Sequence, residues 1–108
     1  MWIFLSDSHL SIVEKGDATG QTLLVRARKA GDIKAVFPDA EVIVGGGTDY
    51  AFRARIDREQ VAQAIAGQVR AVTYPNLKAT VKDRARHDAY LDTWQSMVWF
   101  QEGGRRRR

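Results

Sequence analysis

The stretches Val25-Arg-Ala-Arg28 and Phe52-Arg-Ala-Arg55 decide the predicted fold of this 108-residue chain. Each copy has the pattern of a strand end and is followed by a helical pattern, at residues 32–37 after the first copy and from residue 57 after the second. Strand side chains alternate between two faces, so the arginines of each copy share one face and their apolar neighbours share the other. The repeat therefore predicts two strand-to-helix units in one sheet with a basic outer face.

Further strands are predicted at residues 2–5 and 9–14, as a strand pair or as one long strand bent at residues 6–8, and at residues 41–44. The strand before the second helix spans residues 49–56, and its predicted apolar face carries Tyr50, Phe52, Ala54 and Ile56. Two ββα units in this order predict an α+β fold with a four-stranded antiparallel sheet and helices on one face. The order is that of a ferredoxin-like fold whose termini are moved by one βα unit.

Polar and glycine residues mark the ends of these elements. Gly31 breaks the first Arg-Ala-Arg strand, and Asp32 is predicted to cap the helix after it. Asp57 is predicted as the N-cap of the second helix, with Gln60 three residues later in a capping-box pattern. Gly45–Gly47 predicts a flexible hairpin, because a phosphate-binding loop would need a Lys-Ser/Thr pair opening a helix and these glycines lead into a strand.

The last helix is predicted to open near residues 87–88 and to close at Trp99 and Phe100. Its core-facing stripe has helical spacing and consists of Tyr90, Leu91, Trp94, Met97 and Val98. This stripe is predicted to pack either on the sheet or on a second copy of the chain, which would make a homodimer through the last helix. Trp99 and Phe100 are predicted as partner-binding residues, with core packing as the alternative.

The net charge of +4 resides in the C-terminal tail. Without Arg105, Arg106, Arg107 and Arg108, the chain has 17 − 4 = 13 basic residues against 13 acidic ones. We predict a single α+β domain at residues 1–102 and a disordered Gly-Gly-Arg tail at residues 103–108. The tail either binds phosphates non-specifically or is a solubilising or cloning-derived end with no role.

Composition limits the function classes. The chain has no cysteine, which excludes disulfides and thiolate chemistry and favours a cytoplasmic location. No apolar run approaches the roughly 18 residues needed to cross a bilayer, so no membrane association is predicted. Residues 1–5 lack the basic region and cleavage site of a signal peptide and are predicted as a strand. No cofactor is predicted.

The four arginines of the repeat form the main candidate site. Arg26, Arg28, Arg53 and Arg55 are predicted to share one patch that binds nucleic acid or another anion, since guanidinium groups make bidentate hydrogen bonds to phosphate and carboxylate. The alternative is an ion-paired sheet face, whose carboxylates would come from Asp7, Glu14, Glu41 and Asp49. Exposed aromatic residues on this face would favour nucleic acid, but the sequence leaves open whether Trp2 with Phe4 or Ile3 with Leu5 faces outward.

Asp7 and His9 resemble the first metal motif of calcineurin-like phosphoesterases, in which an Asp and a His two residues later follow a strand. The later motifs of that family are missing here, and the one other histidine is His87. A polar turn of a hairpin is therefore predicted, and no metal.

The N-terminal residues 1–4, the strand 24–28 and residues 49–54 resemble those of a family of small bacterial and phage proteins. The family continues to a Tyr-x-Asn-Phe/Leu-Lys element and a last helix with Tyr and Trp, which here match residues 74–78, Tyr90 and Trp94. No activity, ligand or catalytic residue comes with the resemblance, which implies a stand-alone accessory protein and not an enzyme.

These observations predict a non-catalytic binding protein that engages nucleic acid, or a complex that handles nucleic acid, through the basic sheet face with Arg105–Arg108 assisting. One alternative is a small protein-binding inhibitor, such as a phage-borne anti-defence factor, that uses Trp99 and Phe100. Another is a small metal-dependent enzyme at Asp7 and His9.

Overall fold

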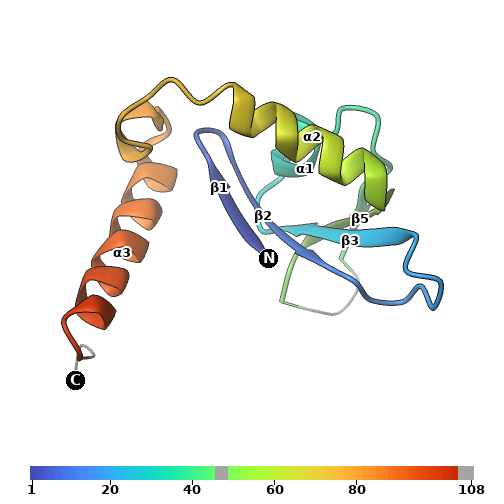
Figure 1. Cartoon of the computed structure of the whole chain (residues 1–108), viewed down its shortest axis with the longest axis horizontal. Helices are drawn as coiled ribbons and strands as arrows, with labels where there is room; N and C mark the ends of the chain where they lie inside the picture. The colour runs from blue at the N-terminus through green and yellow to red at the C-terminus, as the bar shows by residue number, and fades with distance from the viewer. Residues whose placement is uncertain (46–48, 105–108) are drawn as a thin grey trace. The chain divides into compact units, whose positions relative to one another are not determined.

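The computed structural model describes residues 1–45 and 49–104 and divides into two compact units. The first unit, Met1–Thr73, contains a sheet and two helices. The second begins at Tyr74 and contains a short 3-10 helix and the long last helix (Figure 1). The predicted single domain at residues 1–102 stays a prediction, because this division does not test it.

The first unit is built on a five-stranded antiparallel sheet, so the predicted α+β class is confirmed. Its strands lie in the order β1-β2-β3-β5-β4. Their bounds are Trp2–Leu5 for β1, Ser8–Val13 for β2, Thr22–Ala27 for β3, Ile43–Val44 for β4 and Phe52–Asp57 for β5. The sheet has five strands because β1 and β2 form a hairpin, with Leu5 opposite Ser8, in place of one long bent strand.

The helices α1 (Asp32–Val36) and α2 (Arg58–Arg70) pack on one face of this sheet. Ile33, Phe37 and Val61 join the buried side chains of β2, β3 and β5 in one core. The sheet side of this core consists of Leu10, Ile12, Val25, Ala27, Ala54 and Ile56. Apolar neighbours of the arginines therefore face the helices, as the alternation predicts.

The helix starts differ in how they are capped. The Asp57 carboxylate accepts hydrogen bonds from the N–H groups of Glu59 and Gln60 at 3.0 and 3.2 Å, so the predicted N-cap of α2 is confirmed. The predicted capping role of Asp32 is wrong: Gly31 is the N-cap of α1, and no side chain caps that helix. Asp32 is buried in the first turn, where its carboxylate accepts the N–H of His9 at 3.0 Å and ties α1 to β2.

In the second unit, η1 (Lys78–Thr80) precedes α3 (Arg84–Gln101), which begins three residues earlier than predicted. Asp83 is its N-cap and accepts the N–H of Arg86 at 2.9 Å. At the other end, Gly103 has a φ of 83°, and the N–H of Gly104 donates to the carbonyl of Trp99, as in a Schellman motif. The first two residues of the predicted tail therefore end the helix, and Arg105–Arg108 lie outside the described residues.

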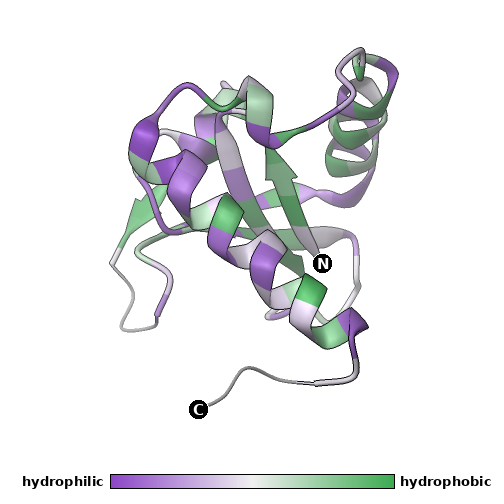
Figure 2. Ribbon diagram, turned by 90° about the vertical axis from the view of Figure 1, so that its left-hand side faces the viewer, coloured by the Kyte–Doolittle hydropathy of each residue, from purple (hydrophilic) through white to green (hydrophobic). Residues whose placement is uncertain are grey.

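The predicted apolar stripe of α3 is only partly buried. Tyr90 is buried and Val98 half-buried, but Leu91, Trp94 and Met97 are 40, 50 and 57% exposed. The prediction that all five residues face a core is therefore wrong for three of them. Within its own unit α3 packs against η1, which is too short to cover an 18-residue helix. Figure 2 shows hydrophobic residues between hydrophilic ones along this helix.

Among the described residues, no helix has the length and apolar character needed to span a bilayer.

We expect Asp32→Ala to lower the free energy of unfolding by about 1–3 kcal/mol, because the N–H of His9 loses its acceptor in a partly buried position. Asp32→Asn keeps an acceptor oxygen and should lower the free energy of unfolding by less. Urea unfolding followed by circular dichroism measures both values. Equal losses for the two variants would show that the hydrogen bond is not what Asp32 contributes.

Candidate nucleic-acid interface

The strand register places the arginines on the sheet face opposite α1 and α2. Arg26 of β3 lies directly opposite Arg53 of β5, so the predicted neighbourhood of the two Arg-Ala-Arg strands is confirmed. Arg55 lies opposite Leu24 on the same face. One row crosses all five strands and consists of Trp2, Ser11, Arg26, Arg53 and Ile43.

Aromatic residues share this face with the arginines. Trp2 is opposite Ser11 in the row and is 70% exposed. Phe4 is two residues further along β1, opposite His9, and the two rings stack with centroids 4.3 Å apart. The structure thus answers the question that the sequence left open, since Trp2 and Phe4 are on the arginine face while Ile3 packs against the core.

Tyr50 is the centre of the arginine cluster. The guanidinium carbons of Arg26 and Arg28 lie 4.5 and 4.2 Å from the centroid of its ring, and Tyr50 is only 6% exposed. The prediction that Tyr50 extends the apolar face of Phe52 is wrong, because β5 begins at Phe52 and the chain bends at Ala51. Because Tyr50 lies outside the strand, its side chain does not follow the strand alternation, and its ring packs against the guanidinium groups of Arg26 and Arg28.

Hydrogen bonds hold three of the arginines in place. A terminal nitrogen of Arg26 donates to the hydroxyl of the buried Ser11 at 2.9 Å. Arg53 donates to the carbonyl of Tyr50 at 3.1 Å. Arg28 donates to the carbonyl of Asp49 at 3.3 Å and lies 3.5 Å from its carboxylate. The segment around Tyr50 is therefore tied to the sheet by several cations, which offsets the repulsion of like charges directly opposite on neighbouring strands.

The predicted ion-paired alternative holds for Arg28. Asp49 pairs with Arg28, whereas Glu14 pairs with Arg58, a residue the sequence analysis did not single out. In residues 1–45 and 49–104, no carboxylate lies within ion-pair distance of Arg26 or Arg55. The arginine face thus keeps positive charge that its own acids do not neutralise.

Arg55 is exposed and is linked to the turn before β3. It donates to the hydroxyl of Thr22 at 3.2 Å, and that hydroxyl donates to the carboxylate of Asp17 at 2.6 Å. Hydrogen bonds from Thr19 and Thr22 hold the pKa of Asp17 well below its usual range. Gly16 has a φ of 84°, and a Cβ atom there would come within 2.7 Å of the Arg55 guanidinium, so a glycine lets the turn and this arginine approach.

The surface-accessible groups of this face are chemically complementary to a nucleic-acid strand. Arg28, with a side chain 53% exposed, and Arg55 present guanidinium donors, and Trp2 presents an open indole face. Guanidinium groups bind phosphate oxygens, and an exposed indole can stack on a base of any sequence. The predicted contribution of Arg105–Arg108 lies outside the described residues.

The other predicted sites are on separate elements. Asp7 is in the turn between β1 and β2, and His9 is stacked on Phe4. In the part of the chain that the structure describes, no three His, Cys, Asp or Glu side chains gather closely enough to hold a metal ion. Phe100 is 72% exposed at the end of α3, and Trp99 beside it is half-buried.

Sequence reasoning missed Tyr50 and Ser11 as parts of the arginine face. The composition around residue 50 carried one signal, since an aromatic residue directly follows Asp49 at the start of a predicted strand rich in arginine. It also missed the contact in the second unit between the ammonium of Lys78 and the ring of Trp94, 4.9 Å from its centroid.

Comparison of the chain with protein-family models, with curated proteins and with solved structures finds no match.

We expect Tyr50→Leu to lower the free energy of unfolding by about 1–2 kcal/mol, because two cation–π contacts disappear while most of the apolar volume stays. Tyr50→Phe keeps the aromatic ring and should lower the free energy of unfolding by less. Chemical denaturation measures both variants. If leucine were tolerated as well as phenylalanine, the arginines would not depend on the aromatic ring.

Proposed function

We propose that this protein binds single-stranded nucleic acid on the arginine face of its sheet and has no catalytic role. The observation that carries the proposal is the exposed Trp2 in one cross-strand row with Arg26 and Arg53. Stacking and phosphate-binding groups on one open sheet face are what a sequence-tolerant single-strand site needs.

Two kinds of interaction provide the affinity. A base stacks on the indole of Trp2, and phosphates accept charge-assisted hydrogen bonds from Arg28 and Arg55. The Tyr50 ring and the carbonyl of Asp49 hold Arg28 in one orientation, so less side-chain entropy is lost when a strand binds. The Arg105–Arg108 tail adds long-range attraction that salt weakens.

A single strand fits this face better than a duplex. Duplex sequence is read by an element that enters a groove, usually a helix or a two-stranded ribbon. Here the charged and aromatic groups lie on the broad face of a sheet, and sheets with aromatic residues on such a face bind splayed single-stranded bases. The permuted ferredoxin-like order and a cytoplasmic location remain part of this proposal.

We expect the double variant Arg28→Ala/Arg55→Ala to weaken binding of a fluorescein-labelled poly-dT or poly-U oligonucleotide at least tenfold in fluorescence anisotropy. Each lost phosphate contact should also reduce the slope of log affinity against log salt by about 0.7, or about 1.4 for the pair. Trp2→Ala should weaken binding by roughly 5- to 150-fold with the salt slope unchanged, since stacking is not a counterion effect.

The matched control is Arg70→Ala, which removes an exposed arginine from the last turn of α2, the helix that covers the other face of the sheet. It should leave the affinity unchanged. Deletion of residues 105–108 distinguishes the contribution of the tail to binding from that of the sheet face. If only the deletion weakens binding and the double variant does not, the sheet face is not the site.

A second candidate function is binding of a protein through α3, as a small inhibitor or as a homodimer. It is favoured by the exposure of Met97 and Phe100, 57 and 72%, on a helix that its own unit does not cover. Exposed aromatic and methionine side chains on one helix are typical of partner surfaces.

We expect the wild-type chain to self-associate in sedimentation-velocity experiments at high concentration, and Met97→Ala/Phe100→Ala to shift the population to monomer by removing apolar contact area. Val69→Ala, at a 67% exposed position on α2, is the control and should leave the dimer intact. A wild-type chain that stays monomeric at the highest concentration would exclude the homodimer.

A further inference from the structure

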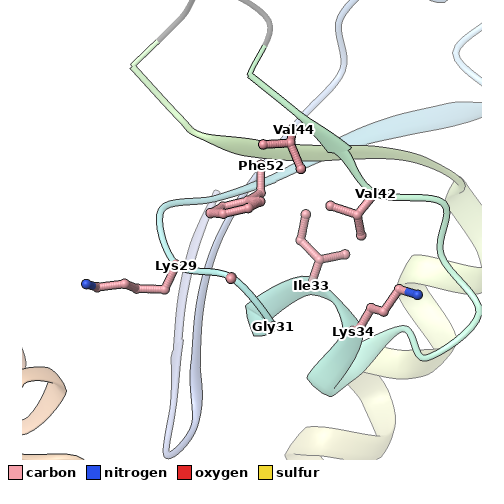
Figure 3. Close-up of a pocket in the computed structure, with 8 residues that line it drawn as sticks. Lys29, Gly31, Ile33, Lys34, Val42, Val44 and Phe52 are labelled. Atoms are coloured by element: carbon pink, nitrogen blue, oxygen red, sulfur yellow. The ribbon is translucent and has the colours of Figure 1, made fainter.

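A small apolar cavity lies between α1 and the edge strand β4, away from the arginine face. Its volume is about 150 Å³. Its apolar walls come from Ile33, Val42, Val44 and Phe52, whose side chains surround it in Figure 3. A cavity of this size in a protein core can hold a benzene molecule, so it has room for one leucine or phenylalanine side chain.

Two lysines flank this cavity. Lys29 and Lys34 belong to its lining, and Figure 3 shows their side chains extending on opposite sides of the apolar group. Both residues are exposed, and no carboxylate is among the lining residues. A group that enters the cavity would therefore fit best if it were apolar and had a negative charge on each side.

The strand beside the cavity has a free edge. β4 is last in the strand order, and among residues 1–45 and 49–104 it pairs with β5 alone. The N–H of Gly45 donates to the carbonyl of Ala51 at 2.8 Å, and Ile43 lies opposite Arg53. Because hydrogen-bonding directions alternate along an antiparallel strand, Val44 between them directs its own N–H and C=O away from β5.

This edge is short, two residues, but it lacks the charged and proline residues that usually block strand addition. Ile43 and Val44 are 58 and 71% exposed, and β4 contains neither proline nor a charged residue. An open backbone edge, an apolar cavity at its side and two flanking cations lie together in one unit of the structure. Strand addition uses just such a combination: main-chain hydrogen bonds give affinity, and pockets for alternate side chains give specificity.

We propose that β4 binds an extended acidic peptide segment of a partner protein, which adds a sixth strand to the sheet. Its backbone pairs with the N–H and C=O of Val44, one apolar side chain enters the cavity, and acidic side chains two residues before and after it pair with Lys29 and Lys34. The spacing follows from strand geometry, since residues i−2, i and i+2 of the peptide share one face. This site is independent of the proposed nucleic-acid interface, because the cavity faces α1 and the arginines do not.

The test uses the full chain and the peptide acetyl-Thr-Glu-Thr-Leu-Thr-Glu-Thr-amide, titrated in two-dimensional NMR. We expect saturable shifts at the amides of residues 42–45 and 29–34. A peptide with lysine in place of glutamate should bind at least tenfold more weakly. The charge-reversal variant Lys29→Glu/Lys34→Glu should invert this preference between the two peptides.

Val44→Pro tests the strand pairing directly. It removes an N–H that β5 does not use, at an edge position where proline is tolerated. Binding of the acidic peptide should be roughly tenfold weaker than to the control Val44→Ala, which keeps the N–H. Circular dichroism and the nucleic-acid affinity of both variants confirm that the fold survives.

Three results would overturn the proposal: no shifts with the acidic peptide at millimolar concentration, equal binding of both peptides, or equal binding by Val44→Pro and Val44→Ala. Titration with hexanoate tests whether a small aliphatic carboxylate binds in the cavity without a peptide backbone. If hexanoate produced the same shifts as the peptide, with the same affinity, the cavity would be a site for aliphatic carboxylates and not for a strand.

Discussion

The antiparallel pairing of β3 with β5 sets the arrangement of both faces of the sheet. It places Val25 and Ala54 in the core under the helices and, by the same alternation, Arg26 opposite Arg53 on the other face. Two guanidinium groups directly opposite each other repel, so the pairing requires something that stabilises the cations. The ring and carbonyl of Tyr50 and the hydroxyl of Ser11 meet that need.

This arrangement gives the arginine face two functional parts. Arg26 and Arg53 serve structure first, since their donors hold the segment around Tyr50 against the sheet. Arg28 and Arg55 are exposed, and a hydrogen bond orients each of them, so they are the arginines to which the proposed site assigns the phosphates. A preorganised cation loses less entropy on binding phosphate than a free side chain does, and this supports the proposal that the arginine face binds an anion.

The two faces of the sheet carry different chemistry. The arginine face combines aromatic and cationic groups over several strands, while the covered face ends at a cavity beside the open edge of β4. A chain with both sites could hold a nucleic-acid strand and an acidic protein segment together, without either ligand blocking the other. The exposed residues of the α3 stripe, Leu91, Trp94 and Met97, belong to the second unit.

Which side chains share a face could be predicted from the sequence, because alternation along a strand is a local property and is evident in Val25-Arg-Ala-Arg28 and Phe52-Arg-Ala-Arg55. The sequence also identified the Asp57 cap, which depends on neighbours within three residues. Three features became known from the fold: Trp2 shares the arginine face, Tyr50 lies outside the strand, and β4 lies at an edge. These outcomes depend on which strands become neighbours and in which register, and a local pattern of polar and apolar residues does not contain that information.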